Sequence, residues 1–310
     1  MTDAQHPRPS ERARELVRGG FDVHVHVAPD VMERRIADSD LAHTFAEAGL
    51  GGFVLKSHYV PTTERAAVVN TLGGARAVGA VTLNAAVGGM NPIAVEIAAR
   101  GGAGFVWMPT VDSANQRACL ASDPEGAKPP MWAQLQDDLR RAGMAADPVP
   151  VLDADGTLLP RTRQVLQVIA THDLVLATGH LHGDEISAVV EAAVATGVRR
   201  IVVTHPEFTS QRLDSEKQQE LAAQGALLER CYTTPLTGKV GWETWFRHIR
   251  EAGPESSVVS SDLGQPFNPP VEDGLGLAAD RLLEHGFSDD EVRTMTVTNT
   301  RALVGADPLP

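Results

Sequence analysis

Short apolar runs alternate with helical patterns along nearly the whole chain, and this alternation constrains the fold more than any other feature of the sequence. Each of eight runs is expected to be a strand that is followed by a helical pattern. The expected strands span residues 21–27, 52–58, 80–87, 104–108, 174–178, 200–204, 226–229 and 257–261. Strand–helix units of about thirty residues imply parallel strands joined by helical crossovers. Eight such units are the number that closes an α/β fold of the (β/α)8 TIM-like barrel type.

Breaks in this alternation indicate how the chain is organised. Residues 1–20 are expected to be a polar tail with a short helix, and the barrel is expected to span residues 21–305. Within 110–160, proline, glycine, aspartate and serine are frequent, and only 131–142 has a helical pattern. We therefore expect an insertion between strands 4 and 5, with a hairpin that turns at Asp155-Gly156. An open doubly wound sheet is the competing architecture, but no Gly-x-Gly-x-x-Gly pattern follows the first strand.

Composition limits the class of partner. An apolar fraction of 43% and a charged fraction of 22% are ordinary for a globular protein. The net charge of −13 argues against nucleic acid and membrane partners, which leaves a small-molecule substrate, with self-association open. The two cysteines cannot form a disulfide framework, and the polar first residues lack the apolar core of a signal peptide. We therefore expect a cytoplasmic location.

The first expected strand carries the pattern His24-x-His26. Successive side chains of a strand point to opposite faces, so the two imidazoles project together while Val23, Val25 and Val27 are expected on the other face. Neutral imidazole is a common ligand of zinc and related divalent metals. Two core histidines satisfied by hydrogen bonds are the alternative, because a lone His-x-His pattern is a weak signal.

Further polar residues end other strands of the expected barrel. Parallel strands place their carboxyl ends on one face of a barrel, so these side chains are expected to converge there. They are His24 and His26 on strand 1, Lys56 and His58 on strand 2, His180 after strand 5, His205 after strand 6 and Asp262 after strand 8. This set is the candidate site.

With these residues in this order, the chain resembles the amidohydrolase superfamily of metal-dependent barrels. The matching motifs are His24-x-His26, His180 in ATGHL, His205 in VVTHP and Asp262 in VVSSDLG. The resemblance spans nearly the whole chain, although Thr300 stands where the closing helix of that superfamily usually has proline. It implies divalent-metal ligands at the five matching positions. Zinc is favoured, manganese is the alternative, and one or two ions are expected.

One departure concerns the anion that bridges two metals. Binuclear members usually have a carboxylated lysine or a glutamate at the end of strand 4, and here that strand ends Val106-Trp107-Met108-Pro109. Either the site is mononuclear, or Lys56 on strand 2 supplies the bridging metal ligand after it reacts with carbon dioxide. A substrate contact is an equal interpretation of Lys56.

Other residues near the strand ends are assigned to substrate binding or to structure. His58 is interpreted as a substrate contact or an additional metal ligand. Glu229 and Arg230, at the end of strand 7, are expected substrate contacts, with a salt bridge as an equal alternative. His182 is expected to cap the helix that follows it. Arg34-Arg35, in the loop after strand 1, is interpreted as a solvated pair rather than a binding site for a substrate carboxylate.

The expected chemistry follows from the ligand set. A divalent metal lowers the pKa of bound water from about 15.7 to near 7 and polarises a scissile carbonyl. Asp262 is the expected catalytic proton shuttle, and His205 is expected to bind a second metal or to stabilise the oxyanion. We therefore expect a metal-dependent hydrolase that acts on an amide, cyclic amide or related C–N bond. Lactone, phosphoester or decarboxylation chemistry, and a non-catalytic metal-binding barrel, are the alternatives.

Overall fold

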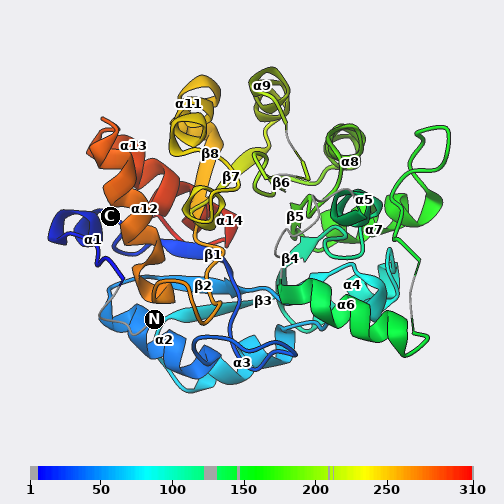
Figure 1. Cartoon of the computed structure of the whole chain (residues 1–310), viewed down its shortest axis with the longest axis horizontal. Helices are drawn as coiled ribbons and strands as arrows, with labels where there is room; N and C mark the ends of the chain where they lie inside the picture. The colour runs from blue at the N-terminus through cyan, green and yellow to red at the C-terminus, as the bar shows by residue number, and fades with distance from the viewer. Residues whose placement is uncertain (1–5, 122–130, 145–146, 209, 212, 309–310) are drawn as a thin grey trace.

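The computed structural model of the protein describes residues 6–121, 131–144, 147–208, 210–211 and 213–308. In this part of the chain, eight parallel strands form one sheet in sequence order, with helices arranged around them (Figure 1). The strands are β1 (Phe21–Val25), β2 (Gly52–Leu55), β3 (Arg76–Thr82), β4 (Ala103–Trp107), β5 (Val175–Ala177), β6 (Arg200–Val203), β7 (Leu227–Cys231) and β8 (Ser257–Ser260).

Backbone hydrogen bonds between β1 and the chain after β8 close this sheet into a barrel. The amide of Asp262 donates to the carbonyl of His24 at 2.9 Å, and the amide of His26 donates to the carbonyl of Leu263 at 2.8 Å. Val25 and Leu263 form a parallel bridge at the same place. The expected (β/α)8 barrel is therefore confirmed, and the open-sheet alternative is wrong.

Helices connect the strands and cover the outside of the barrel. They are α1 (Glu11–Leu16), α2 (Asp38–Glu47), α3 (Thr63–Thr71), α4 (Pro92–Arg100), α5 (Ala114–Ala121), α6 (Met131–Arg141), α7 (Pro160–Thr171), α8 (Gly183–Thr196), α9 (Ser215–Ala223), α10 (Thr233–Leu236), α11 (Trp242–Ala252), α12 (Gly274–Glu284), α13 (Asp289–Arg293) and α14 (Asn299–Leu303). Among the described residues, no helix combines the length and the apolar character that crossing a membrane requires.

The strands present one set of side chains to the barrel interior and another to the helices. An interior apolar cluster gathers residues from β1 to β6 and from β8, including Trp107, whereas Val106 packs outward. On β1 the expected strict alternation is wrong, because Val23 packs in the interior cluster while Val25 packs with the outer one. The pairing of β1 with β2 shifts register between Asp22 and Val25, and this irregularity accounts for the change of face.

Between β4 and α7 the chain leaves the regular alternation, as its composition suggested. Leu152 and Leu158 form an antiparallel bridge, and the amide of Asp153 donates to the carbonyl of Thr157 at 2.8 Å. These contacts make a tight turn around Asp155-Gly156, where the hairpin was expected. One isolated bridge closes this turn, and no longer two-stranded ladder forms among the described residues.

Helix α5, in the same region, was not expected from the sequence. Its start is fixed by Ser113, whose Oγ accepts from the amide of Gln116 at 3.0 Å and donates to the carbonyl of His180 at 2.9 Å. The side-chain amide of Asn115 also donates to the carbonyls of His180 and Ser210. Contacts with residues far away in sequence therefore stabilise a short polar segment whose own pattern is weak. Part of the expected insertion, residues 122–130, lies outside the described residues.

Thr300 stands where the amidohydrolase superfamily usually has proline, and it joins the C-terminal helices to the first strand. Its Oγ1 accepts from the amide of Phe21 at 3.1 Å and donates to the carbonyl of Thr296 at 2.8 Å. A proline side chain offers no such hydroxyl, so the threonine supplies a specific bond that a proline would lack.

The barrel closure generates a stability prediction at Gly264. Its φ is +133°, and a Cβ at this position would overlap the carbonyl oxygen of His26. We expect Gly264→Ala to lower the free energy of unfolding by more than the roughly 1–3 kcal/mol that an unfavourable backbone conformation costs by itself. Gly225→Ala is the matched control, because Gly225 also has a positive φ, of +90°, but open space around it. Equal losses in denaturant unfolding of the two variants would contradict the prediction.

Candidate metal centre

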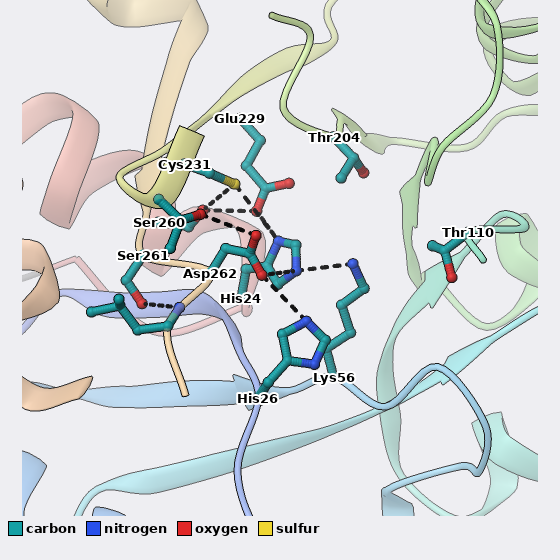
Figure 2. A network of polar contacts seen from close by, with 12 residues as sticks. His24, His26, Lys56, Thr110, Thr204, Glu229, Cys231, Ser260, Ser261 and Asp262 are labelled. Atoms are coloured by element: carbon teal, nitrogen blue, oxygen red, sulfur yellow. Dashed lines mark hydrogen bonds and ion pairs between the residues drawn. The ribbon is translucent and has the colours of Figure 1, made fainter. Parts of the chain in front are cut away.

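The polar residues that end the strands meet at one cavity at the carboxyl end of the barrel, with a volume of about 180 Å³. The predicted site residues that line it are His26, Lys56, His58, His180, His205 and Asp262. His24 lies beside them, with its ring centre 5.4 Å from that of His26. Figure 2 shows His24, His26 and Lys56 directed toward Asp262.

His24, His26 and Asp262 form a compact group of candidate metal ligands. Asp262 Oδ1 lies 3.2 Å from His24 Nε2 and 3.3 Å from His26 Nε2. The ligand atoms of the three residues all lie within 4.8 Å of one another. Strand β1 supplies His24, His26 follows directly after its end, and the barrel closure brings the carboxylate beside them. Imidazole nitrogens with one carboxylate make a ligand set that zinc and related divalent ions bind.

Asp262 is held as an anion by its neighbours. Burial opposes its ionisation, but His24, His26 and Lys56 outweigh that effect and lower the pKa of Asp262 well below its usual value. Its backbone φ is +54°, in the left-handed region that is uncommon for residues other than glycine, and His205 has φ of +22°. Such backbone conformations concentrate at functional sites, where the surrounding structure enforces them.

Glu229 orients His24 through the other ring nitrogen. Its Oε1 lies 2.9 Å from His24 Nδ1 and accepts from Ser260 Oγ at 2.8 Å (Figure 2). Burial opposes ionisation of Glu229, but His24 and the other nearby basic groups lower its pKa below the usual value. Since a carboxylate only accepts, Nδ1 of His24 donates to Glu229, and Nε2 is the ring nitrogen that faces Asp262 and Lys56. Carboxylate–histidine pairs of this kind orient metal ligands and raise their basicity.

Lys56 places a basic group beside the same ligands. Its Nζ lies 2.9 Å from His24 Nε2 and 5.3 Å from the centre of the Trp107 ring. The residue is only 2% exposed, and burial lowers its pKa, with Asp262 and Glu229 opposing that shift. A lowered pKa increases the population of the neutral amine, which is the form that reacts with carbon dioxide.

Three further imidazoles face the cavity from other strands. Burial lowers the pKa values of His58, His180 and His205, that of His205 to about 4, so all three are neutral at pH 7. His58 Nδ1 lies 2.8 Å from Thr110 Oγ1, whereas Nδ1 of His180 and of His205 has no hydrogen-bond partner within the described chain. Neutral imidazoles with unpaired buried nitrogens fit a site that binds a cation.

The two substrate contacts predicted on β7 lie elsewhere. Arg230 is fully buried on the outer face of the strand, where it forms an ion pair with Glu207 and donates to Gln218 at 2.6 Å. Successive side chains alternate between faces, so Glu229 points into the barrel and Arg230 points toward the helices. Arg230 therefore forms the salt bridge that was the alternative to a substrate contact, and Glu229 contacts His24 instead of lining the cavity.

The interpretation of Arg34-Arg35 as a solvated pair is wrong. Arg34 lines the cavity and forms an ion pair with Asp30 at 2.7 Å, and both side chains are almost completely buried. Arg35 donates to the carbonyls of Pro266 and Asn268 at 3.0 and 2.8 Å. The loop after β1 therefore packs against the loop after β8, a contact between distant segments that no local pattern indicates.

Sequence patterns also missed several residues of the cavity wall, which include Phe208, Lys239, Gln265 and Asn268 in loops, Trp132 in α6 and Thr233 in α10. No local periodicity singles these residues out, and the only signal is the position of Thr233 soon after β7. His182, in contrast, caps α8 as expected, and its ring accepts from the amide of Asp184 at 3.3 Å.

The sequence of the chain matches one protein family. Residues 19–229, more than half of the chain, match the model of a family of unknown function, DUF6282. The chain belongs to the DUF6282 family. The matched region contains His24, His26, Lys56, His180 and His205, whereas Asp262 lies beyond it. No curated protein matches the sequence.

Solved structures share the fold of this DUF6282 protein at low sequence identity. An amidohydrolase from Pseudomonas aeruginosa has a TM-score of 0.59 and 11% identity, over 96% of this chain and 100% of that chain. The probable dipeptidase PvdM from the same organism has a TM-score of 0.58 and 12% identity, over 95% and 97%. An amidohydrolase from Burkholderia multivorans has a TM-score of 0.54 and 13% identity, over 93% and 99%. These matches confirm the resemblance to amidohydrolases at the level of the fold.

The contact between Glu229 and His24 generates a prediction about metal affinity. We expect Glu229→Gln to weaken binding of zinc by about 10- to 100-fold, because a neutral amide no longer fixes the His24 tautomer or raises its basicity. Calorimetric titration of metal-free protein with zinc measures the effect. Glu243→Gln is the matched control, since Glu243 also contacts a histidine, His285, at 3.0 Å, but its side chain is 86% exposed. Equal zinc affinity in the two variants would show that Glu229 does not act on the metal ligand.

Proposed function

We propose that this DUF6282 protein is a metal-dependent hydrolase that cleaves an amide, cyclic amide or related C–N bond. The observation that carries the proposal is the contact of both His24 Nε2 and His26 Nε2 with Asp262 Oδ1 at the carboxyl end of a barrel. That end is where barrels of this type place their catalytic residues. The names of the structural neighbours, amidohydrolases and a probable dipeptidase, support a hydrolase, and the class of bond is part of the proposal.

The proposed ion is zinc, with manganese as the alternative. His24, His26 and Asp262 would hold it, and His180 and His205 would complete its ligands or hold a second ion. When bound, such an ion lowers the pKa of a water molecule and polarises a scissile carbonyl. The neutral state of His180 and His205 suits this role, because a protonated imidazole offers no lone pair to a metal.

Asp262 is the group that we assign to proton transfer. It is ionised at neutral pH, its side chain is 23% exposed on the cavity side, and its Oδ2 accepts from Thr233 Oγ1 at 3.1 Å. In this role it takes a proton from the attacking water and delivers it to the leaving nitrogen. His205, neutral on the cavity wall, is assigned to donate a hydrogen bond to the developing oxyanion or to bind the second ion.

The metal and the proton shuttle are tested together. Protein prepared without chelator is expected to contain at least one zinc-like or manganese-like ion, and less than about a tenth of an equivalent after reconstitution would contradict the proposal.

Asp262→Asn is expected to keep the fold and to lower turnover by about 10²- to 10⁴-fold, because an amide cannot accept the proton. A screen of amides, lactones and phosphoesters with the metal-loaded protein identifies the bond. Metal binding without turnover on any of them would favour a non-catalytic barrel.

A second prediction concerns the number of ions. Two bare cations about 3.5–4 Å apart repel each other strongly unless an anion lies between them, and a carboxylated Lys56 would supply that anion. We expect wild-type protein to bind two ions when bicarbonate is added and Lys56→Ala to bind one, as measured by metal analysis. Lys239→Ala, which removes another lysine of the cavity wall, is the control and should keep both ions. One ion in every variant, with no effect of bicarbonate, would indicate a mononuclear site in which Lys56 contacts substrate.

A further inference from the structure

The cavity is more basic than the protein around it. Among the described residues, its wall contains the basic side chains Arg34, Lys56 and Lys239 and a single acidic one, Asp262, although the whole chain has a net charge of −13. Basic groups on a cavity wall attract small anions, and here Asp30 balances part of the charge of Arg34. The volume of about 180 Å³ restricts the occupant to a small molecule.

Arg34 is held in a fixed orientation on this wall. Its Nε and Nη2 each lie 2.7 Å from Asp30 Oδ2, and Nη2 lies 3.5 Å from Nδ1 of His26. No partner is found within the described chain for its remaining terminal nitrogen, Nη1. Because Arg34 contacts Nδ1 of His26, its guanidinium lies on the opposite side of the imidazole ring from the Nε2 atom that faces Asp262.

The loop that carries Arg34 is itself fixed. The amide of Ala28 donates to the carbonyl of Ile36 at 2.9 Å, and the amide of Arg35 donates to the carbonyl of Gly264 at 2.8 Å. The buried ion pair of Arg34 with Asp30 is a weak source of stability, because desolvation of both charges offsets their attraction. A charged side chain that is buried, held rigidly and placed on a cavity wall suits recognition of a ligand, because little entropy is lost on binding.

We propose that Arg34 binds a carboxylate of the substrate while the bond to be cleaved lies at His24, His26 and Asp262. This inference rests on the proposed hydrolase function, and it specifies the substrate as a small carboxylic acid that also carries the cleavable bond. Nη1 of Arg34 can donate to a carboxylate oxygen, and such a charge-assisted hydrogen bond is stronger than one between neutral groups. On the same wall Asn268 Nδ2 donates to Gln265 Oε1 at 2.7 Å, which adds polar groups for the remainder of the substrate.

Calorimetric titration with succinate and with its neutral analogue succinamide tests the proposal on metal-free and zinc-loaded protein. Wild-type protein is expected to bind succinate, and Arg34→Gln to bind it about 10- to 100-fold more weakly, as loss of a hydrogen bond to a charged group implies. Arg65→Gln is the matched control, because Arg65 also pairs with an aspartate, Asp38, at 3.0 Å but lies outside the cavity wall. The Arg65→Gln variant should bind succinate within about twofold of wild type, because substitutions away from a binding site usually change free energies only slightly.

Removal of Arg34 leaves Asp30 buried without its partner, so Arg34→Gln could fail to fold. The double variant Asp30→Asn/Arg34→Gln then gives the same comparison, because removing both partners of an ion pair costs far less than removing one. Three results would overturn the proposal. They are unchanged succinate affinity in the folded Arg34 variants, equal affinity of wild type for succinamide, and Arg34-dependent binding of inorganic phosphate that is tighter than that of succinate.

The same titrations, together with the metal analysis and the turnover screen, separate this inference from the proposed function. Arg34-dependent succinate binding in a protein that never retains a metal would support the carboxylate site and contradict the hydrolase. Metal binding and turnover with no effect of Arg34 on succinate affinity would support the hydrolase and contradict the carboxylate site. Succinate binding that requires zinc but not Arg34 would mean that the carboxylate contacts the metal, and it would also overturn the proposed site.

Discussion

The candidate site depends on how the barrel closes. Strand β1 and the chain after β8 are joined by backbone hydrogen bonds between Asp262 and His24 and between His26 and Leu263. These bonds place the carboxylate of Asp262 within 3.3 Å of both imidazole Nε2 atoms, although more than two hundred residues separate them in the sequence. Every other residue of the site is positioned relative to this group, because parallel strands bring all carboxyl ends to the same face.

Buried charge explains why these residues are arranged as they are. An ionised group in a dry interior is unfavourable unless an opposite charge or hydrogen bonds compensate it. Asp262 and Glu229 therefore lie on opposite nitrogens of His24, with Lys56 beside it, and Arg34 is matched by Asp30. The remaining imidazoles of the cavity lose their charge instead, because burial lowers their pKa values. Neutral imidazoles around an anionic carboxylate make a favourable environment for a divalent cation.

Alternation along a strand accounts for both the successes and the errors on site residues. Alternation predicts that His24 and His26 project together, and in the structure both point toward Asp262, as does Lys56 (Figure 2). The same alternation means that Glu229 and Arg230, which are neighbours on β7, cannot both face the cavity. On β1 strict alternation failed for the valines, since the register shift near Asp22 is a property of the pairing with β2 rather than of β1 alone.

The sequence by itself determined the number of strand–helix units, the parallel barrel and the strand ends on which candidate ligands lie. These features depend on local periodicity, which is present in residues that are close together in the sequence. Tertiary structure alone decided the partners of each side chain: Glu229 on His24, Arg230 against the helices, and Arg34 in the cavity wall. It also decided helix α5, which depends on bonds to the loops after β5 and β6. Contacts between segments distant in sequence are set by how the closed barrel packs its loops, and no local pattern contains that information.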